Sequence, residues 1–287
     1  MNLKDTFFSK KQTLNFRGVL AQIDSPLVMG ILNVTPDSFY DGGRHNDEEG
    51  MKALCARMLD EGASIIDIGA YSSRPGAENI SEEAELDRFV NALKILRRNF
   101  GDILISVDTF RARIAEVVVK EFGVQMINDI SAGLLDEEML PMVGRLKVPY
   151  VMMHMPGNPQ TMAQNTQYSN LVNDLLFFFG TQIRKALESG IDDVIIDPGF
   201  GFGKTLEQNF RLLSHLKEFR ILETLILVGV SRKSMIFRTI GKTPDEALAG
   251  TIAAETLALL GGADILRVHD VKEAIDAMKI VKAFQKG

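Results

Sequence analysis

The sequence predicts an α/β fold in which eight strand-plus-helix units close into a parallel (β/α)8 barrel, as a single domain over residues 1–287. Three observations lead to this prediction. An apolar run closed by a polar residue occurs eight times, stretches with helical periodicity separate consecutive runs, and 287 residues suit a barrel that typically needs about 250. This architecture is the TIM barrel, and a short hairpin before the first run is expected to close its floor.

The eight apolar runs have the character of strands that are buried on both faces. They are 28–33, 64–69, 103–108, 124–129, 148–154, 193–197, 225–231 and 265–269. Their polar members are Asn33, Asp67, Asp108, Asn128, Asp129, His154, Asp197, Ser231 and His269. Because the carboxyl ends of barrel strands face one mouth, these polar side chains are expected to gather at a site there.

Residues 13–23 precede the first strand and are expected to form the hairpin, with its turn near Arg17 and Gly18. Between the second and third strands, residues 82–98 have helical periodicity. Charged residues occupy one face of this expected helix, and its apolar face is formed by Ala84, Phe89, Leu93 and Leu96.

Two long loops follow the first two strands. Residues 34–43 and 70–77 are too rich in Pro, Gly and small polar residues for regular structure. Long loops at a barrel mouth usually carry function. Arg74, beside Pro75 in the second loop, is therefore either solvated surface or a clamp for an anion.

The stretch 193–204 combines a buried strand, a carboxylate and a glycine-rich loop. Asp197 ends the apolar run, Pro198 cannot donate to a sheet, and the loop glycines permit backbone angles that are closed to other residues. Asp197 either caps the helix expected near Thr205 or belongs to a site. Its repetition at other strand ends favours the site.

Composition limits the possible partners. With 46% hydrophobic and 24% charged residues the chain resembles an ordinary globular protein, and its net charge of -6 argues against a nucleic-acid partner. No run reaches the roughly 18 apolar residues of a membrane span, and the amino terminus lacks a signal-peptide core. The only cysteine, Cys55, lies in an apolar helical pattern and is expected to be a packed thiol. We expect a cytoplasmic protein with no membrane partner.

Seven motifs, each at a strand end and in this order along the chain, resemble the dihydropteroate synthase family. They are 30–39 (GILNVTPDSF), 73–76 (SRPG), 106–109 (SVDT), 127–129 (IND), 197–204 (DPGFGFGK), 229–234 (GVSRKS) and 267–269 (RVH). The resemblance implies the barrel fold and a transferase of folate biosynthesis. Such an enzyme joins 6-hydroxymethyl-7,8-dihydropterin pyrophosphate to p-aminobenzoate and releases pyrophosphate.

By resemblance, the pterin is bound by Asp108, Asn128, Met153, Asp197, Lys233 and Arg267. A pterin edge offers paired donors and acceptors, so carboxylates and an amide deep in a barrel suit it. The Arg267 guanidinium is expected to stack along the ring. The alternatives are helix capping for Asp108 and Asn128 and an exposed side chain for Lys233.

The diphosphate leaving group needs positive charge where its own charge develops. The resemblance assigns it to Asn33, Arg74, Arg267 and His269, with Asn33 as a ligand of Mg²⁺. Asn33 could instead bond the following turn. Together with Asp108 and Lys233 these residues form the expected catalytic set. The family's reaction resembles a dissociative substitution, which requires no protein nucleophile, and no Ser-His or Cys-His pairing is evident.

The second substrate is a flat benzoate, and the resemblance places its pocket at Phe39, Ser73, Pro75, Phe202, Ser231 and the stem of Lys233. Sulfonamide drugs compete at this pocket in the family. Two residues depart from the usual pattern: Tyr71 stands where the family more often has an acid, and Ser73 where it more often has threonine.

Two other functions remain possible from the sequence. A pterin-binding methyltransferase domain would share the barrel and the Asp-Asn-Asp set, but it has no need of a diphosphate clamp. A non-catalytic binding paralogue would be expected to lack one of Asn33, Arg74, Lys233 or Arg267, and all four are present. The expected partners are the two small-molecule substrates and a second copy of the chain, because the family is usually a homodimer through its last helices.

Overall fold

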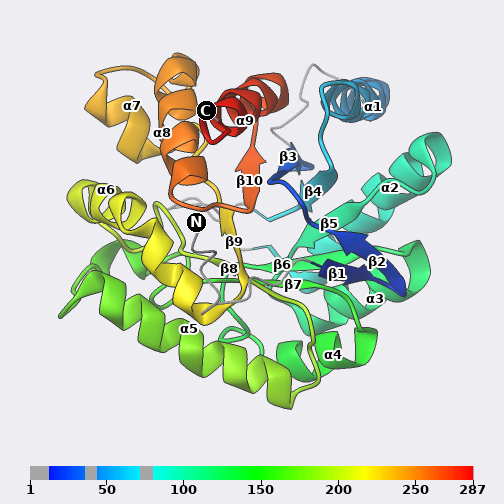
Figure 1. Ribbon diagram of the computed structural model, residues 1–287. Helices are drawn as coiled ribbons and strands as arrows, with labels where there is room; N and C mark the ends of the chain where they lie inside the picture. The colour runs from blue at the N-terminus through cyan, green and yellow to red at the C-terminus, as the bar shows by residue number, and fades with distance from the viewer. Residues whose placement is uncertain (1–12, 36–43, 72–79, 287) are drawn as a thin grey trace.

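Eight parallel strands form a closed barrel in the computed structural model, which describes residues 13–35, 44–71 and 80–286 (Figure 1). The strands follow one another around the barrel in sequence order, and the last pairs with the first. They are β3 (Leu27–Asn33), β4 (Ile65–Gly69), β5 (Ile105–Asp108), β6 (Met126–Asp129), β7 (Tyr150–Met153), β8 (Val194–Asp197), β9 (Leu225–Val228) and β10 (Ile265–Val268). The predicted (β/α)8 barrel is confirmed.

Helices form the outer ring of the molecule (Figure 1). They are α1 (Arg44–Asp60), α2 (Glu82–Phe100), α3 (Ala112–Phe122), α4 (Met139–Leu146), α5 (Leu171–Glu188), α6 (Leu206–Ser214), α7 (Ser234–Thr239), α8 (Leu248–Leu260) and α9 (Val271–Phe284), with 3-10 turns η1 (Met162–Gln164) and η2 (Leu216–Leu222). Cys55 is buried in α1, as expected.

Several strands are shorter than the apolar runs that predicted them. Val124 lies just after α3, where its amide donates to the carbonyl of Val118 as part of the turn that ends the helix. At the other end of a strand, Val230 lies in a turn, since its carbonyl accepts from the amide of Lys233. Both valines are buried, so hydrophobicity alone extends the run beyond the strand.

The hairpin closes the barrel floor as predicted. Strands β1 (Thr13–Phe16) and β2 (Val19–Gln22) pair antiparallel, with Arg17 and Gly18 at positive φ in the turn. Its Leu14 and Phe16 pack against inward-facing strand residues, which are Met29, Ile65, Met126, Val151, Ile195, Leu225, Leu227 and Ile265. This apolar floor seals one end of the barrel and leaves the other end for chemistry.

The predicted apolar face of α2 is correct at three positions and wrong at one. Phe89, Leu93 and Leu96 are buried, but Ala84 is only half-buried, and the neighbouring Glu85 is fully buried instead. Glu85 accepts hydrogen bonds from Thr109 Oγ1 at 2.9 Å and Arg111 Nη1 at 2.7 Å. A buried carboxylate is tolerated there because a cation and a hydroxyl compensate for its lost hydration.

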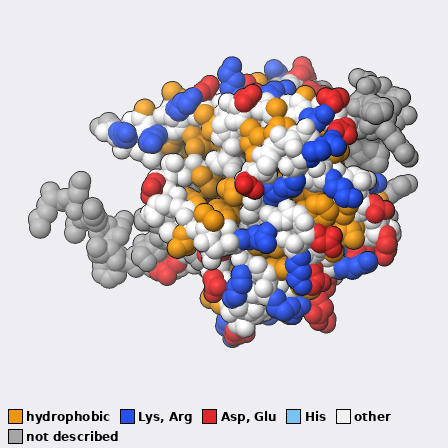
Figure 2. Space-filling model, turned by 90° about the vertical axis from the view of Figure 1, so that its right-hand side faces the viewer, with side chains coloured by type: hydrophobic (Ala, Val, Ile, Leu, Met, Phe, Trp, Pro, Cys, Tyr) orange, Lys and Arg blue, Asp and Glu red, His pale blue; other side chains and the backbone are white. Residues whose placement is uncertain are grey.

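Acidic and basic side chains are interspersed over the face in Figure 2, without a broad area of one sign. Across the described parts of the chain, none of the helices combines the length and the apolar character that crossing a membrane requires.

Truncation of a floor residue is expected to destabilise the barrel. Leu14 is 0% exposed, so Leu14→Ala should lower the free energy of unfolding by about 2 to 5 kcal/mol through lost contacts and a cavity. Urea denaturation followed by circular dichroism measures this change. The matched control is Leu20→Ala on the same hairpin, where Leu20 is 71% exposed, and its effect should stay within about 0.5 kcal/mol. Equal effects of the two substitutions would contradict the role of the hairpin as a floor.

Candidate active site

An interior layer of polar side chains lies directly above the apolar floor. In a strand, residues two positions apart face the same side, so the residue two after each floor residue also points inward. This relation connects Ile65 with Asp67, Met126 with Asn128, Val151 with Met153, Ile195 with Asp197, and Ile265 with Arg267. The alternation therefore brings most of the predicted pterin-binding residues into one layer.

Arg267 joins two carboxylates of this interior layer. Its Nε donates to Asp67 Oδ2 at 2.7 Å, and its Nη2 donates to Asp108 Oδ2 at 2.9 Å. Asn128 Nδ2 donates to the same oxygen of Asp67 at 3.2 Å. Burial opposes the charge on Arg267, but the two carboxylates outweigh it and raise the pKa of the guanidinium. The arginine is thus a fixed cation in the barrel.

The carboxyl groups of the layer have higher pKa values than ordinary surface acids. Burial raises the pKa of Asp108 to about 7, because the neighbouring carboxylates add to the effect of burial and together they outweigh Arg267. Burial also raises the pKa of Asp197, against the opposing charge of Lys233. Perturbed carboxyl groups gathered in one cavity are typical of functional sites.

Helix capping does not account for these side chains. Helix α6 starts after Thr205, which supplies its own capping box with Gln208. Asp197 Oδ1 instead accepts from the amide of Gly199 at 2.8 Å, in the turn that begins the glycine-rich loop. Helix α3 has no side-chain cap at Arg111. The alternative interpretation of Asp108, Asn128 and Asp197 as caps is therefore wrong.

Lys233 lies against the glycine-rich loop rather than in solvent. Its Nζ donates to the carbonyl of Phe200 and lies 4.8 Å from the centre of the Phe202 ring. Burial lowers the pKa of Lys233 to about 8, although Asp197 counteracts part of that effect. The structure thus brings the predicted Lys233 and Phe202 together, within the electrostatic reach of Asp197.

The glycine-rich loop is held by Lys204, the last residue of the motif 197–204, to which the resemblance assigns no role. Lys204 Nζ is buried and donates to the carbonyls of Gly199 at 2.9 Å and Phe202 at 3.0 Å. It also lies 3.1 Å from His154 Nδ1. Burial lowers the pKa of Lys204 to about 7 and that of His154 to about 2.

Gly199 itself permits the tight approach of this loop to β7. Its φ is +73°, and a Cβ atom there would lie 2.1 Å from the carbonyl oxygen of His154. Gly201 and Gly203 also have positive φ, at +80° and +59°. The expectation that these glycines adopt backbone angles closed to other residues is confirmed.

Two polar strand ends point away from the mouth, contrary to the expectation for the whole series. Asp129 alternates with Asn128 and so faces the helices, where it accepts from Tyr150 Oη at 2.5 Å and from the amide of Gly133 at 2.7 Å. His154 packs edge-on against Phe178 of α5, with ring centres 4.8 Å apart. A run that ends in two polar residues can offer only one of them to the interior.

An apolar cluster forms one wall near the mouth. It consists of Ile130, Met153, Met155 and Met162, with Phe110 and Phe202 packed against it. Tyr71, the departure from the family pattern, meets Phe110 edge-on with ring centres 5.3 Å apart. Its hydroxyl accepts from Gln160 Nε2 at 3.0 Å. Tyr71 thereby connects the end of β4 with the segment that follows β7.

The loops after β9 and β10 are braced against each other. Ser231 Oγ lies 3.1 Å from His269 Nδ1, and the amide of His269 donates to Ser231 Oγ at 3.2 Å. Arg232 donates through Nε and Nη2 to the Asp270 carboxylate at 3.0 and 2.6 Å. Two predicted residues, Ser231 and His269, are thus brought into direct contact.

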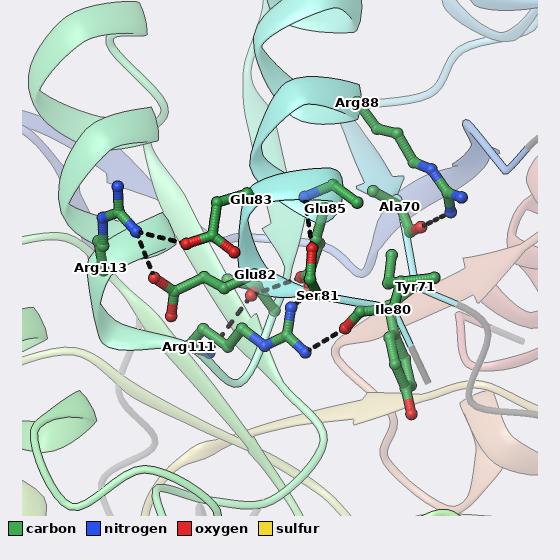
Figure 3. Close-up of polar contacts among 12 residues, drawn as sticks. Ala70, Tyr71, Ile80, Ser81, Glu82, Glu83, Glu85, Arg88, Arg111 and Arg113 are labelled. Carbon is green, nitrogen blue, oxygen red and sulfur yellow. Dashed lines mark hydrogen bonds and ion pairs between the residues drawn. The ribbon is translucent and has the colours of Figure 1, made fainter. Parts of the chain in front are cut away.

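Arginines hold the two described flanks of residues 72–79 (Figure 3). Arg88 Nη1 donates to the carbonyl of Ala70 at 2.9 Å, and Arg111 Nη2 donates to that of Ile80 at 2.7 Å. The predicted site residues Phe39, Ser73, Arg74 and Pro75 lie outside the described residues. Sequence reasoning missed Arg88 and Arg111 because a charge on a helical face usually indicates solvent exposure.

The carboxyl end of β3 offers an oxygen ligand that suits magnesium. Asn33 is half-buried there, and a Cβ on Gly69 would lie 3.1 Å from Asn33 Oδ1, so the glycine leaves room for the carboxamide. Within residues 13–35, 44–71 and 80–286, no three His, Cys, Asp or Glu side chains gather to hold a metal. Magnesium often takes one or two protein oxygens and completes its shell with water and phosphate, so this end fits it.

Comparisons with known proteins agree with this geometry. The sequence matches the family described as pterin binding enzyme over residues 29–269. Dihydropteroate synthase of Escherichia coli K12 is 40% identical over 269 residues, covering 93% of this chain and 94% of that protein. The Yersinia pestis dihydropteroate synthase solved with a sulfonamide drug has a TM-score of 0.88 and 41% identity, covering 96% of this chain and 100% of that chain.

A Xanthomonas albilineans dihydropteroate synthase solved with 4-aminobenzoic acid has a TM-score of 0.89 and 39% identity, covering 97% of this chain and 100% of that chain. The range that matches the family, residues 29–269, includes the strands that carry the interior polar layer. The chain therefore belongs to the pterin-binding enzymes and, within them, to the dihydropteroate synthases, which are transferases.

Proposed function

We propose that this dihydropteroate synthase uses its interior polar layer to hold 6-hydroxymethyl-7,8-dihydropterin pyrophosphate while p-aminobenzoate replaces the diphosphate. The observation that carries the proposal is the convergence of Asp108, Asn128 and Asp197 around Arg267 and Lys233. A flat heterocycle with several donors and acceptors matches such a ring of polar groups, with Met153 as an apolar contact.

Recognition of the pterin rests on complementary hydrogen bonds deep in the barrel. Asp108 and Asp197 accept from ring N–H and amino groups, Asn128 can do either, and Lys233 donates. Burial strengthens each of these bonds, because water does not compete for them. Arg267 lies between Asp67 and Asp108, and its guanidinium plane is the surface on which the ring stacks.

Departure of the diphosphate breaks the bond between the methylene carbon and oxygen, and both electrons leave with the diphosphate. Arg74, Arg267 and His269 stabilise the negative charge that develops. Asn33 supplies an oxygen for Mg²⁺, which neutralises diphosphate charge when it is bound. His269 is supported in this role by its contacts with Ser231 at 3.1 and 3.2 Å.

The second half of the reaction forms a carbon–nitrogen bond. The lone pair of the neutral aromatic amine attacks the methylene carbon of the pterin cation, and the amine then loses a proton to give 7,8-dihydropteroate. The cation is already strongly electrophilic, so no protein nucleophile is required. Asp108, Asp197 and their neighbours keep the reacting carbon at the mouth by fixing the ring below it.

The benzoate is proposed to lie between Phe202, Ser231 and the stem of Lys233, with Phe39, Ser73 and Pro75 completing its pocket. The contact between Lys233 and the Phe202 ring at 4.8 Å supports a shared wall. Solved relatives carry 4-aminobenzoic acid and a sulfonamide drug. We extend both ligands to this pocket and propose that sulfonamides compete with p-aminobenzoate here.

We also propose that the chain forms a single domain, assembles as a homodimer and lies in the cytoplasm. The closed barrel over residues 27–268 supports a single domain over 1–287. Adjacent helices α8 and α9 expose apolar side chains, namely Leu257, Leu260, Ile280 and Phe284, which supports a homodimer through these last helices (Figure 1). A buried, unpaired Cys55 supports a reducing cytoplasm.

Turnover of the two substrates tests the proposed function directly. We expect the purified protein, with the pterin diphosphate, p-aminobenzoate and Mg²⁺, to release dihydropteroate and pyrophosphate in equal amounts, as measured by chromatography. Omission of p-aminobenzoate should abolish dihydropteroate formation. Tight pterin binding without any product would instead identify a non-catalytic paralogue.

Binding of the pterin should depend on pH through Asp108. Its carboxyl group has a pKa of about 7, so it becomes an acceptor only as the pH rises past that value. Affinity for a pterin without diphosphate should therefore increase between about pH 6 and 8, as measured by calorimetry. In Asp108→Asn this inflection should disappear. If it persisted there, another group with a pKa near 7, such as Lys204, would be responsible.

Loss of the Asn33 side chain should weaken the magnesium dependence. Removal of one oxygen from a cation costs about 1.5 kcal/mol or more, so Asn33→Ala should raise the Mg²⁺ concentration for half-maximal turnover about tenfold. Asn33→Asp keeps an oxygen and serves as the control. A magnesium titration of Asn33→Ala that matched the unaltered enzyme would refute the assignment.

A further inference from the structure

Asp67 is the one member of the interior polar layer to which no role has yet been assigned. It lies on β4, and its Oδ2 accepts from Arg267 Nε at 2.7 Å and from Asn128 Nδ2 at 3.2 Å. Both donors are residues that we propose to contact the pterin. They come from strands on opposite sides of β4 in the barrel order, so one oxygen connects two walls of the pocket.

The Asp67 side chain is enclosed by its neighbours. It is 0% exposed, whereas Arg267 and Asp108 each keep about a fifth of their side chains accessible. Any influence of Asp67 on the pterin must therefore pass through Arg267 and Asn128. A residue in this position affects the reaction only through the orientation that it gives to the neighbouring side chains.

The first consequence concerns Asn128. A carboxylate paired with a guanidinium offers only acceptors, so the Asn128 carboxamide must turn its amino group towards Asp67. Its carbonyl oxygen is then directed away from Asp67. Asn128 thus presents an acceptor to the ligand, next to the acceptors of Asp108 and Asp197.

The second consequence concerns Arg267 and Asp108. A guanidinium can pair with a carboxylate through two parallel hydrogen bonds, which would occupy both oxygens of Asp108. Asp67 binds Nε and leaves Nη2 to reach Asp108, at 2.9 Å to Oδ2. The second oxygen of Asp108 is thereby kept for the pterin.

We propose that Asp67 is a positioning residue that sets the donor and acceptor pattern of the pterin pocket, by orienting Asn128 and by preventing Arg267 from closing on Asp108. This inference rests on the proposed function, because it takes the pterin as the ligand. It adds a residue that touches neither substrate. The proposal also predicts that pterin affinity depends on whether the atom that faces Asn128 is a hydrogen-bond acceptor, and not only on the packing at position 67.

Exchange of the two side chains tests this prediction. Asp67→Asn and Asn128→Asp should each lower kcat/KM for the pterin diphosphate about ten- to a hundredfold, because each single change disturbs one buried charge-assisted pair. In the double variant Asp67→Asn/Asn128→Asp, the new amide can donate to the new carboxylate. The exchange restores the pairing, and kcat/KM should recover to within about tenfold of the unaltered enzyme. The KM for p-aminobenzoate should not change in any of the three.

Two control variants separate positioning from stability. Ser106→Ala removes a fully buried hydroxyl that pairs in register beside Asp67 and has no hydrogen-bond partner among the described residues. Asp193→Asn removes a buried carboxylate at the floor, where Asp193 Oδ2 accepts from the amide of Asn15 at 2.6 Å. Both should leave kcat/KM for the pterin diphosphate unchanged, whatever they do to urea unfolding.

The outcomes distinguish the inference from the proposed function. Pterin affinity is also measured by calorimetry, so the variants remain informative if the protein does not turn over. Loss in both single variants with recovery in the exchange supports the inference. Unchanged pterin affinity in Asp67→Asn overturns it. So does an equal loss for pterin and p-aminobenzoate without recovery, which would indicate a structural role for Asp67.

Discussion

The site depends on one constraint, which is that charges inside a closed barrel must compensate one another. Arg267 binds Asp67 at 2.7 Å and Asp108 at 2.9 Å, above a floor of packed apolar side chains. Removal of one partner from such a buried set leaves an uncompensated charge and typically costs about 3 to 5 kcal/mol. These charges are costly to bury, but their hydrogen bonds hold the polar side chains in one geometry. Burial, together with the neighbouring carboxylates, raises the pKa of Asp108 to about 7 against the opposing charge of Arg267.

In the glycine-rich loop, backbone carbonyl groups rather than carboxylates compensate a buried lysine. Its carbonyl groups converge on the buried Lys204, and the Cβ-free Gly199 lets the loop approach His154 closely. A cation among carbonyl oxygens has its charge spread over several dipoles, so no carboxylate hydrogen bond is needed. The position of the loop in turn fixes the Phe202 ring and the Phe200 carbonyl. Both of these groups contact Lys233. Rigid backbone thereby fixes a flexible side chain at the mouth.

Much of the architecture can be predicted from the sequence. Continuous apolar runs that end in a polar residue locate all eight strands, and glycine at positive φ marks the loop after Asp197. The motif resemblance predicts a pterin site at Asp108, Asn128, Met153, Asp197, Lys233 and Arg267, and among these residues the structure shows a direct hydrogen bond between Arg267 and Asp108. Asp129 and His154 could not be oriented in advance. The face that each of them takes depends on strand register and on where the strand ends, and the apolar runs specify neither.

The sequence alone determined the barrel, its hairpin floor and the family, because these follow from local periodicity and from motifs that are contiguous in the chain. Only the tertiary structure decided the roles of Asp67, Lys204 and Glu85. In the sequence Asp67 is one of several polar residues at strand ends, and Lys204 and Glu85 look like ordinary charged residues. Each is buried next to a partner from another part of the chain. Asp67 meets a guanidinium 200 positions away, and Lys204 meets a histidine 50 positions away. The pairing of buried charges is a property of the closed fold, since only closure brings distant strands close enough to compensate one another.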